Sequence, residues 1–405
     1  MATESNAYVK YYEKVQDKFI PLNVHWDFTY RCDHKCVHCY ITERKSNELS
    51  LAEAEALFDE LAKAGTLTLL FSGGDPFVRP DAMDIIAAAR ARRFDVRINT
   101  HGNHITEAIA DQLADLGVMR VGISVYSLDP KEHEAVTLIE GSHAKTIAAC
   151  RMLSERGIKV TMKTPVVEPN QLSYHRVGEL AKEIGAEWSI DTTLMPDDES
   201  DYGLCGIGVH PTERKLGLMK AFEDSGADFS DLTKYVGEDS DKRTCSAGTA
   251  YAYISPDGTL YPCLHWRDPI GNIRETPFGE LWNHSPIAAK QREITRASYL
   301  SDCDGCSFHR HCSYCPGLSH SETGDAGRRS PHVCERTHLT QAAMEQMSTL
   351  QKEGRPVPDP GTAEAHELLT QSTFAERQWA ARQAQITRPA DRLRQKLVQI
   401  EDPRK

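Results

Sequence analysis

Residues 22–40 read LNVHWDFTYRCDHKCVHCY, a β-rich run followed at once by clustered cysteines. We expect Leu22–Phe28 to form a strand. The tight loop after it carries three thiols, on Cys32, Cys36 and Cys39. Three thiolates on one loop suit three irons of a [4Fe–4S] cluster and leave the fourth iron open. A structural zinc ion is the alternative, but it needs four ligands, and the nearest further candidates, His34 and His38, lie inside the same loop.

From about residue 23 to 195, short β-rich runs alternate with amphipathic helical patterns. The expected strands are Leu22–Phe28, Leu67–Phe71, Val96–Asn99, Arg120–Val125, Lys159–Lys163 and Glu187–Ile190, and the expected helices cover about 50–64, 80–92, 106–116, 143–156 and 171–184. Such alternation is typical of βα units around a parallel sheet, and six strands are too few for a closed eight-stranded barrel. We therefore predict an α/β fold, a partial (β/α)6 TIM-type barrel, with its active site at the C-terminal ends of the strands.

Composition narrows the class of protein. The chain has 405 residues and a net charge of −12, which argues against a general nucleic-acid-binding protein. It contains no apolar run of 18 residues, and its N-terminus lacks the apolar segment of a secretory signal. We therefore expect a cytoplasmic protein that does not bind membranes. Ten of the twelve cysteines fall into two groups, and in an intracellular chain this clustering indicates metal binding rather than disulfides.

The cysteine loop resembles the signature of the radical S-adenosylmethionine (SAM) superfamily. The stretch Ser72-Gly73-Gly74-Asp75-Pro76 after the second strand is similar to the family's GGE motif, with Asp in place of Glu, and its exposed backbone would bind the SAM amino group. The resemblance implies that the open iron chelates the amino and carboxylate groups of SAM. It further implies that one-electron reduction releases a 5′-deoxyadenosyl radical, which abstracts hydrogen from a substrate.

The same resemblance implies SAM contacts elsewhere in the chain. His38, before the third cysteine, would lie against the adenine. The remaining contacts would come from strand ends, at Thr100, Asn103, Ser124, Lys163 and Leu194. Lys163 would pair with the SAM carboxylate, although an ordinary exposed lysine at a strand end is an equal alternative.

The second group of cysteines resembles the SPASM auxiliary-cluster domain, with one residue fewer between Cys312 and Cys315 than the family pattern. This resemblance implies one complete [4Fe–4S] cluster on Cys303, Cys306, Cys312 and Cys334, and a second cluster on Cys245, Cys263 and Cys315 with an unassigned fourth ligand. Together with the SAM cluster, three [4Fe–4S] clusters are expected. A pair of zinc knuckles is the alternative, because thiolate spacing alone does not separate zinc from iron–sulfur.

Two cysteines remain outside these sets. Cys150 lies in a helical stretch, and we expect it to be a buried apolar filler. Cys205 lies in the polar, Gly-rich stretch 196–210 and is one candidate for the unassigned fourth ligand. A non-cysteine ligand or an open iron is the other possibility, and we favour an open site that binds a substrate thiolate.

Five segments are expected along the chain. They are an N-terminal segment (1–22), the partial barrel (23–210), a helical linker (211–244), the SPASM domain (245–338) and a helical C-terminal extension (339–405). A β-hairpin is predicted around residues 256–258, where the sequence reads PDG between two β-rich runs.

The domain combination resembles that of peptide maturases, so the leading hypothesis is oxidative modification of a ribosomally made peptide. Sulfatase-maturing relatives carry a basic Asp at the position of Leu264, so the base here would be Asp191, His265 or Asp268. The alternatives are a dehydrogenase or sulfatase-type maturase acting on a small molecule or folded protein, and a non-catalytic iron–sulfur carrier. Expected partners are a peptide substrate, a reductant such as flavodoxin or ferredoxin, and a separate leader-binding protein.

Overall fold

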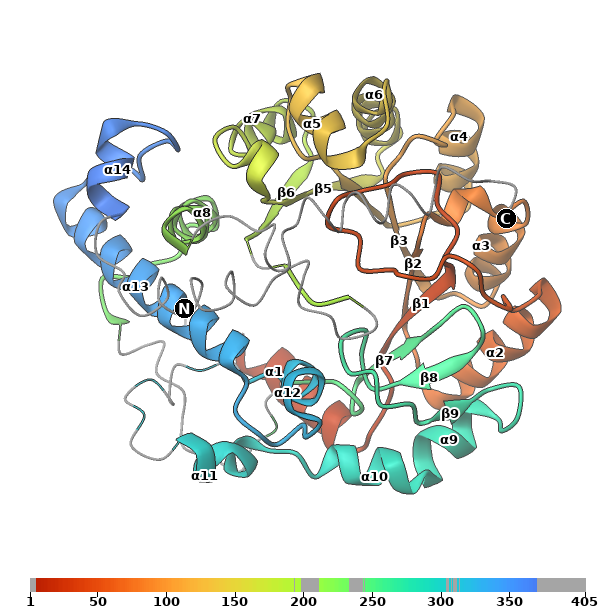
Figure 1. The fold of residues 1–405 in the computed structure, drawn as a ribbon. Helices are drawn as coiled ribbons and strands as arrows, with labels where there is room; N and C mark the ends of the chain where they lie inside the picture. Colours follow the sequence, from red (N-terminus) through yellow and green to blue (C-terminus); the bar gives the residue numbers. More distant parts are fainter. Residues whose placement is uncertain are drawn as a thin grey trace.

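Figure 1 shows the chain as a computed structural model, which describes residues 5–192, 194–197, 211–232, 243, 245–303, 306, 308, 312 and 314–369. The strands in this part of the chain are β1 (Asn23–Thr29), β2 (Thr68–Gly73), β3 (Asp95–Thr100), β4 (Arg120–Ser124), β5 (Lys159–Pro165), β6 (Glu187–Asp191), β7 (Tyr251–Ile254), β8 (Thr259–Tyr261) and β9 (Gly271–Asn272). They form one sheet in the order β6-β5-β4-β3-β2-β1-β7-β8-β9.

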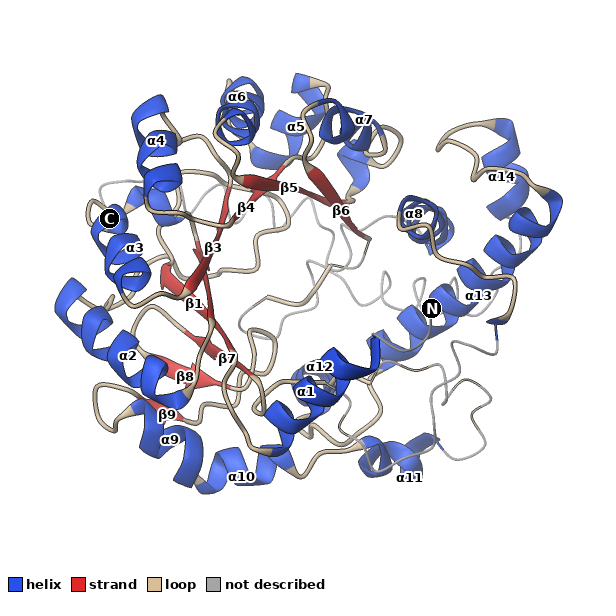
Figure 2. Ribbon diagram, turned by 180° about the vertical axis from the view of Figure 1, so that it is seen from behind, coloured by secondary structure: helices blue, strands red, loops and turns tan. Residues whose placement is uncertain are grey.

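The first six strands are parallel neighbours, as expected for a partial barrel. All six predicted strands are present, with ends within two residues of the prediction. The helices between them are α2 (Leu51–Ala64), α3 (Ala82–Ala91), α4 (Glu107–Asp115), α5 (Pro130–Thr137), α6 (Ser142–Glu155) and α7 (Arg176–Glu183). These helices cover the outer face of the curved sheet, and the loop after β1 lies on its inner side (Figures 1 and 2). The predicted α/β partial barrel is confirmed.

Two helices differ from the prediction. The stretch predicted at 171–184 becomes helical only at Arg176, because a 3-10 turn (Glu168–Asn170) and further turns precede it. Helix α5 was not predicted, although Asp129 accepts the Lys131 N–H as its N-cap and a proline follows at the first helical position.

The hydrophobic core gathers around β1. This strand has neighbours on both sides, so six of its seven residues are buried. Trp26, Phe28, Phe58 and Phe71 pack edge-to-face, with ring centroids 5.3–5.9 Å apart. The strand that carries the cysteine loop is therefore held by apolar packing on one face, while His25, Asp27 and Thr29 are buried polar residues on the other.

The predicted hairpin is present, but its position was not foreseen. Strand β7 pairs in parallel with β1, from Asn23 opposite Tyr251 to Trp26 opposite Ile254. Strand β8 then pairs antiparallel with β7, across a turn in which Gly258 has a φ of +86°. The segment predicted to open a separate domain at 245 therefore extends the barrel's own sheet.

The C-terminal helices form a second core. It is built mainly by helices α8 (Pro211–Asp224), α13 (Pro331–Glu353) and α14 (Ala363–Leu369). Its buried residues include Leu216, Met219, Phe229, Ala343, Met344, Met347 and Leu350. A buried ion pair between Arg214 and Glu335 joins α8 to α13. These helices lie on the open side of the curved sheet (Figures 1 and 2). The predicted linker at 211–244 and the C-terminal extension thus pack together in the part that is described.

The remaining described helices are α1 (Ser5–Asp17), α9 (Phe278–His284), α10 (Pro286–Arg292), α11 (Leu300–Cys303) and α12 (Pro316–Thr323). Cys150 on α6 is fully buried in the barrel core, which confirms its role as a filler. None of the described helices has the length and apolar character needed to cross a membrane.

Leu260 on β8 is fully buried in the same core as the barrel strands, so it tests the continuity of the sheet. Leu260→Ala is expected to destabilise the protein by about 2–5 kcal/mol, because it leaves a cavity between the hairpin and the barrel. Calorimetry should show a lower unfolding temperature for this variant. The matched control is Leu172→Ala, at a side chain 56% exposed, and equal shifts for both variants would contradict the shared core.

Candidate functional site

The turn after β2 approaches the cysteine loop more closely than any side chain allows. Gly73 has a φ of +128°, and a Cβ on it would lie 1.9 Å from the carbonyl oxygen of Thr29. A Cβ on Gly74 would lie 2.1 Å from the carbonyl oxygen of Arg31. The turn also donates backbone hydrogen bonds to these two carbonyls, from Gly74 (2.8 Å) and Asp75 (2.9 Å). Both glycines are therefore required by backbone packing.

A cavity of about 210 Å³ lies at the C-terminal ends of β2 to β5, beside the cysteine loop. Its wall contains many of the predicted site residues, namely Cys32, Cys36, Cys39, His38, Gly73, Gly74, Thr100, Ser124 and Lys163. It also contains residues that were not predicted to contact SAM, namely Tyr30, His34, Tyr40, Ile41, Arg44, Ser72, Asn99, His101 and Tyr126. Most of these adjoin a cysteine or a strand end in the sequence, which is the signal that would have found them.

The three loop thiols form a donor set that fits a metal cluster. Burial, together with the nearby Cys39 and Cys32, raises the pKa of Cys36 to about 12. Crowded thiols of this kind ionise readily only when a cation compensates their charge, and metal binding then releases their protons. The donor set, the loop geometry and the glycine turn therefore suit a [4Fe–4S] cluster with SAM beside it.

Arg44 stabilises the cysteine loop by hydrogen bonds to its backbone. Its Nη1 donates to the carbonyl oxygens of Cys32 (2.8 Å) and His34 (2.6 Å), and its Nη2 lies 4.0 Å from the sulfur of Cys39. One guanidinium thus fixes two backbone carbonyls and places positive charge beside a ligand thiolate. Arg44 was not predicted, because no spacing rule marks a lone arginine five residues after Cys39.

The carboxylate of Asp75 points into the protein. Asp75 is fully buried, and its oxygens accept hydrogen bonds from the Phe77 N–H (3.0 Å), the His101 N–H (2.9 Å) and the Thr100 hydroxyl (2.5 Å). The acidic residue of the glycine turn therefore ties this turn to the end of β3. The Asp that stands in place of Glu is long enough for this structural role.

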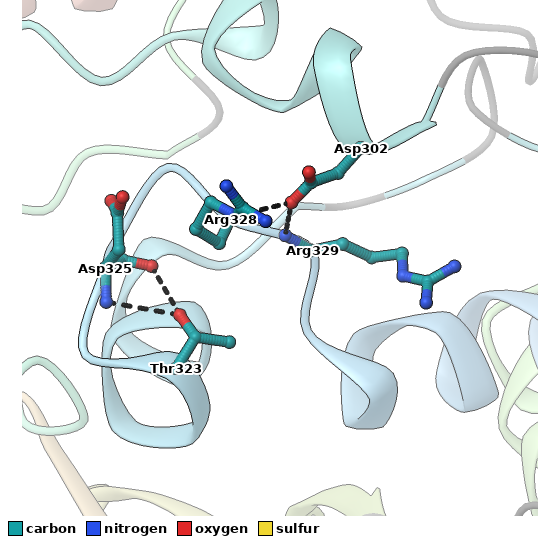
Figure 3. A pocket seen from close by; sticks show the side chains of 5 residues that line it. All are labelled: Asp302, Thr323, Asp325, Arg328 and Arg329. Atoms are coloured by element: carbon teal, nitrogen blue, oxygen red, sulfur yellow. Dashed lines mark hydrogen bonds and ion pairs between the residues drawn. The ribbon is translucent and has the colours of Figure 1, made fainter.

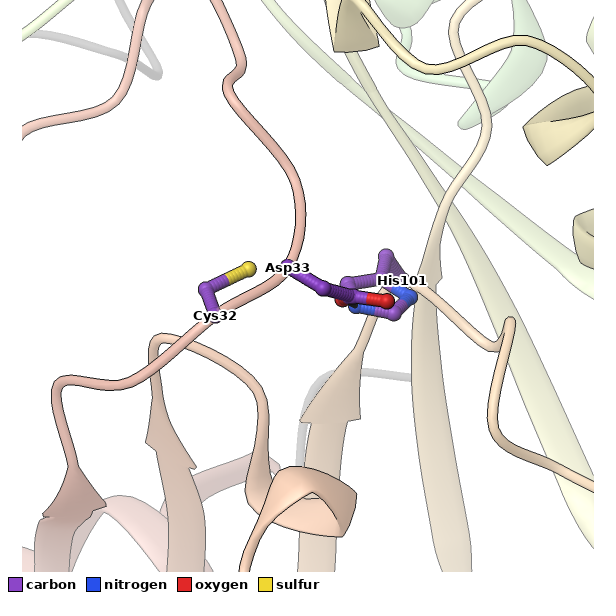
Figure 4. Close-up of side chains that lie close together, drawn as sticks. All are labelled: Cys32, Asp33 and His101. Atoms are coloured by element: carbon purple, nitrogen blue, oxygen red, sulfur yellow. Dashed lines mark hydrogen bonds and ion pairs between the residues drawn. The ribbon is translucent and has the colours of Figure 1, made fainter. Parts of the chain in front are cut away.

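His101 connects the end of β3 to the cysteine loop. Figure 4 shows its ring beside Asp33 and Cys32, and its Nε2 lies 2.9 Å from Asp33 Oδ1. The ring stacks on His34 at a centroid distance of 3.7 Å. Its Nδ1 accepts the Asn103 N–H (3.1 Å), so the ring proton lies on Nε2 and faces the carboxylate. The loop is thereby clamped to the barrel.

Four predicted SAM contacts lie outside the described lining of the cavity, namely Asp75, Pro76, Asn103 and Leu194. Asn103 donates its amide to the Thr146 hydroxyl (2.8 Å) and the Ser142 carbonyl (3.2 Å), so it anchors helix α6. Leu194 is buried in a small apolar cluster with Tyr126. Pro76 is buried at the start of a 3-10 turn. Contact between these residues and SAM stays a prediction.

His38 and Lys163 have side chains in the cavity wall. Burial lowers the pKa of His38 to about 4, so its ring is neutral at neutral pH. The ring packs edge-on against Tyr126 with centroids 5.2 Å apart, which leaves a flat neutral surface suited to an aromatic base. Lys163 is half-buried rather than exposed at the end of β5, and burial lowers its pKa. Its ammonium, when protonated, offers a cation to a carboxylate in the cavity.

The structure gathers the remaining cysteines into two sets. Burial and the nearby Cys315 and Cys245 raise the pKa of Cys263 to about 12. The second set surrounds Cys334, where burial and three neighbouring thiols raise the pKa to about 11; those neighbours are Cys312, Cys303 and Cys306. Each set matches the grouping that the sequence predicts, and the clusters themselves stay a prediction. Cys205 lies outside the described residues.

The three candidate bases differ in their surroundings. His265 is largely buried, and burial lowers its pKa to about 4, so it is a neutral ring and a weak base. Asp268 accepts a hydrogen bond from the Gln291 amide (3.2 Å), which makes it an anchor for helix α10. Asp191 is exposed at the end of β6, and its charge acts on Lys163 across the strand pair. Their assignment as bases stays a prediction.

A second hollow, of about 550 Å³, lies beside Cys303, a member of the set around Cys334 (Figure 3). It is lined by Asp302, Thr323, Asp325, Arg328 and Arg329. Asp302 pairs with Arg328 (2.8 Å) and accepts the Arg329 N–H (3.0 Å). Its polar groups largely satisfy one another, so this surface is a solvated groove at the edge of the domain.

Comparison with known proteins identifies two family models in the chain. The model of the radical SAM superfamily matches residues 26–183, and the SPASM model, an iron–sulfur cluster-binding domain, matches residues 245–307. The chain is 27% identical over 342 residues to an AdoMet-dependent heme synthase from Methanosarcina barkeri, covering 78% of this chain and 97% of the relative. It is also 27% identical over 342 residues to a PqqA peptide cyclase from Xanthomonas campestris pv. campestris, covering 78% and 87%.

Among solved structures, the chain is similar to Streptococcus suis SuiB bound to S-adenosylmethionine. The TM-score is 0.63 at 16% sequence identity, and the match covers 81% of each chain. At this identity the likeness shows the fold alone. It agrees with the partial barrel followed by an iron–sulfur region and C-terminal helices described above.

Replacing all three loop cysteines by alanine, at Cys32, Cys36 and Cys39, is expected to abolish SAM cleavage. The reason is that these three thiols are the cysteines that line the SAM cavity, while the other seven clustered cysteines lie elsewhere in the fold. Iron analysis of the anaerobic protein should show that the auxiliary iron is retained. Full SAM cleavage by this variant would contradict the assignment of the loop.

Arg44→Gln is expected to lower the iron content of the loop and to broaden its EPR signal. The change removes the donor to two loop carbonyls and the charge beside Cys39. Its matched control is Lys45→Gln, at the neighbouring exposed position. Iron content and EPR linewidth equal to those of the control would show that Arg44 does not hold the loop.

Proposed function

Because the chain is a radical SAM enzyme with a SPASM iron–sulfur domain, we propose that it oxidatively modifies a ribosomally made peptide by abstracting hydrogen from an unactivated carbon. The observation that carries this proposal is the joining of both cysteine groups through one sheet. Strand β1 leads into the loop of Cys32, and strand β7, its direct neighbour, leads through β8 to Cys263.

In the barrel, the loop thiols would hold the SAM cluster through Cys32, Cys36 and Cys39. When bound, SAM and this cluster supply a carbon radical that removes a hydrogen atom from a substrate C–H bond. The residues of this chain position the cofactor. Gly73 and Gly74 line the cavity, Lys163 provides a cation for a carboxylate, and the neutral ring of His38 offers a flat surface for the adenine.

The second half of the reaction needs an electron acceptor. A substrate that has lost a hydrogen atom must lose one further electron and a proton before a stable crosslink or double bond forms. We propose that the cysteine sets around Cys263 and Cys334 would hold clusters, which would supply an acceptor for this electron. The candidates to accept the proton are Asp191, Asp268 and His265, of which His265 lies two residues after Cys263. A reductant such as flavodoxin or ferredoxin would supply the electron that starts each cycle, and a separate protein would present the leader.

The peptide class is supported by the similarity to a PqqA peptide cyclase. A second candidate is a heme-type tetrapyrrole, which is favoured by a match covering 97% of an AdoMet-dependent heme synthase. Leu264 stands where sulfatase-maturing relatives carry their base, which argues against formylglycine formation. The two candidates differ in size and shape, so direct assay separates them.

The experiment uses the anaerobically reconstituted enzyme with SAM and dithionite. We expect 5′-deoxyadenosine to form, and a protein that makes none would be an iron–sulfur carrier. Incubation with a peptide encoded beside the gene should then lower the peptide mass by the mass of lost hydrogen atoms. Turnover of Fe-coproporphyrin instead would select the second candidate.

A variant in the set around Cys263 tests whether this set is needed to accept the electron. Cys263→Ala is expected to retain SAM cleavage but to lose substrate oxidation, because the electron has no acceptor near the hairpin. Cys150→Ala is the matched control, since Cys150 is buried in the barrel core away from both sets. Substrate oxidation at the wild-type rate by Cys263→Ala would exclude this role for the hairpin cluster.

A further inference from the structure

Arg267 is a half-buried arginine between the two cysteine groups, and its Nε and Nη2 atoms are buried. It follows Cys263 by four residues, and its guanidinium lies over the rings of Tyr253 and Tyr261, 4.8 and 5.5 Å from their centroids. Its Nη1 lies 3.5 Å from the hydroxyl of Tyr30, which lines the cavity beside the cysteine loop. The stacking fixes the plane of the guanidinium at the seam between barrel and hairpin.

Among the described residues, the Nε and Nη2 of this guanidinium have no hydrogen-bond partner. No described carboxylate forms an ion pair with it, and the nearby Asp27 is occupied by His25 and two tyrosine hydroxyls, those of Tyr40 and Tyr253. An arginine keeps its charge in proteins, and a buried charge without a counter-ion is strongly unfavourable. Within the described part of the chain, the Nε and Nη2 donors of Arg267 are therefore available to an anion.

Arg267 lines a small recess whose other walls include residues next to both cysteine groups. Tyr40, directly after Cys39, lines one side, and Leu264 and His265, directly after Cys263, line another. Asp197 also lines it but has an interaction of its own. The recess measures about 10 Å³, room for about one water molecule.

We propose that Arg267 binds a carboxylate of the substrate through its Nε and Nη2. These two N–H groups point the same way and match the two oxygens of a carboxylate in a bidentate pair. The site would anchor the substrate between the radical-generating cavity and the auxiliary cysteines. It rests on the proposed function and narrows it to a carboxylate-bearing substrate, such as an acidic peptide side chain, a peptide C-terminus or a tetrapyrrole propionate.

The test uses acetate as a probe on the full-length, anaerobically reconstituted enzyme, with SAM saturating so that its own carboxylate site is filled. Calorimetric titration at constant ionic strength compares acetate with acetamide, its uncharged analogue of similar shape. We expect acetate to bind and acetamide not to bind. Arg267→Gln should weaken acetate binding by about tenfold or more, because it removes the charge and the paired donors.

Two further variants make the outcome unambiguous. Arg267→Lys keeps the charge without the paired donors and should retain part of the affinity. Arg274→Gln, on the same hairpin segment but paired with Glu53 at the surface, should bind acetate as the wild type does. Equal binding of acetate and acetamide, or wild-type affinity in both Arg267 variants, would overturn the proposal.

The outcomes separate this site from the proposed function. An enzyme that cleaves SAM but binds no acetate keeps the proposed function and loses the carboxylate site. An enzyme that binds acetate through Arg267 but makes no 5′-deoxyadenosine keeps the site and loses the proposed function.

Discussion

The close backbone contact between the glycine turn and the start of the cysteine loop is the constraint on which the site depends. A Cβ at either glycine would overlap a carbonyl oxygen of the loop, at 1.9 Å for Gly73 and 2.1 Å for Gly74. Around this contact, Asp75 ties the turn to β3, His101 ties β3 to the loop, and Arg44 holds the loop carbonyls. The loop thiols are thus presented by backbone geometry rather than by flexible side chains.

The same sheet carries the second cysteine group. Because β1 pairs with β2 on one side and with β7 on the other, the barrel and the auxiliary hairpin share one set of hydrogen bonds and one core. The buried carboxylate of Asp27 lies at this seam, 2.9 Å from both His25 Nε2 and the Tyr253 hydroxyl. Relative motion of the two cysteine groups would break these contacts, so their separation is fixed by the fold.

The thiol sets and the arginine near this seam each need a partner of opposite charge. Crowded thiols have raised pKa values at Cys36, Cys263 and Cys334, and each set needs cations to become a set of thiolates. Arg267 presents the opposite case, a half-buried cation that no described anion neutralises. Metal clusters satisfy the first requirement, and a substrate carboxylate satisfies the second.

The sequence by itself determined the six barrel strands, the hairpin turn and the cysteine groups. These features are local, because apolar periodicity, turn residues and ligand spacing are read within a few residues. Only the tertiary structure decided that β7 pairs with β1, that Asn103 and Asp75 face inward, and that Arg44 and Arg267 reach the site. Each of these depends on contacts between segments far apart in the chain, and the burial that gives a lone arginine or asparagine its role exists only after the chain has folded.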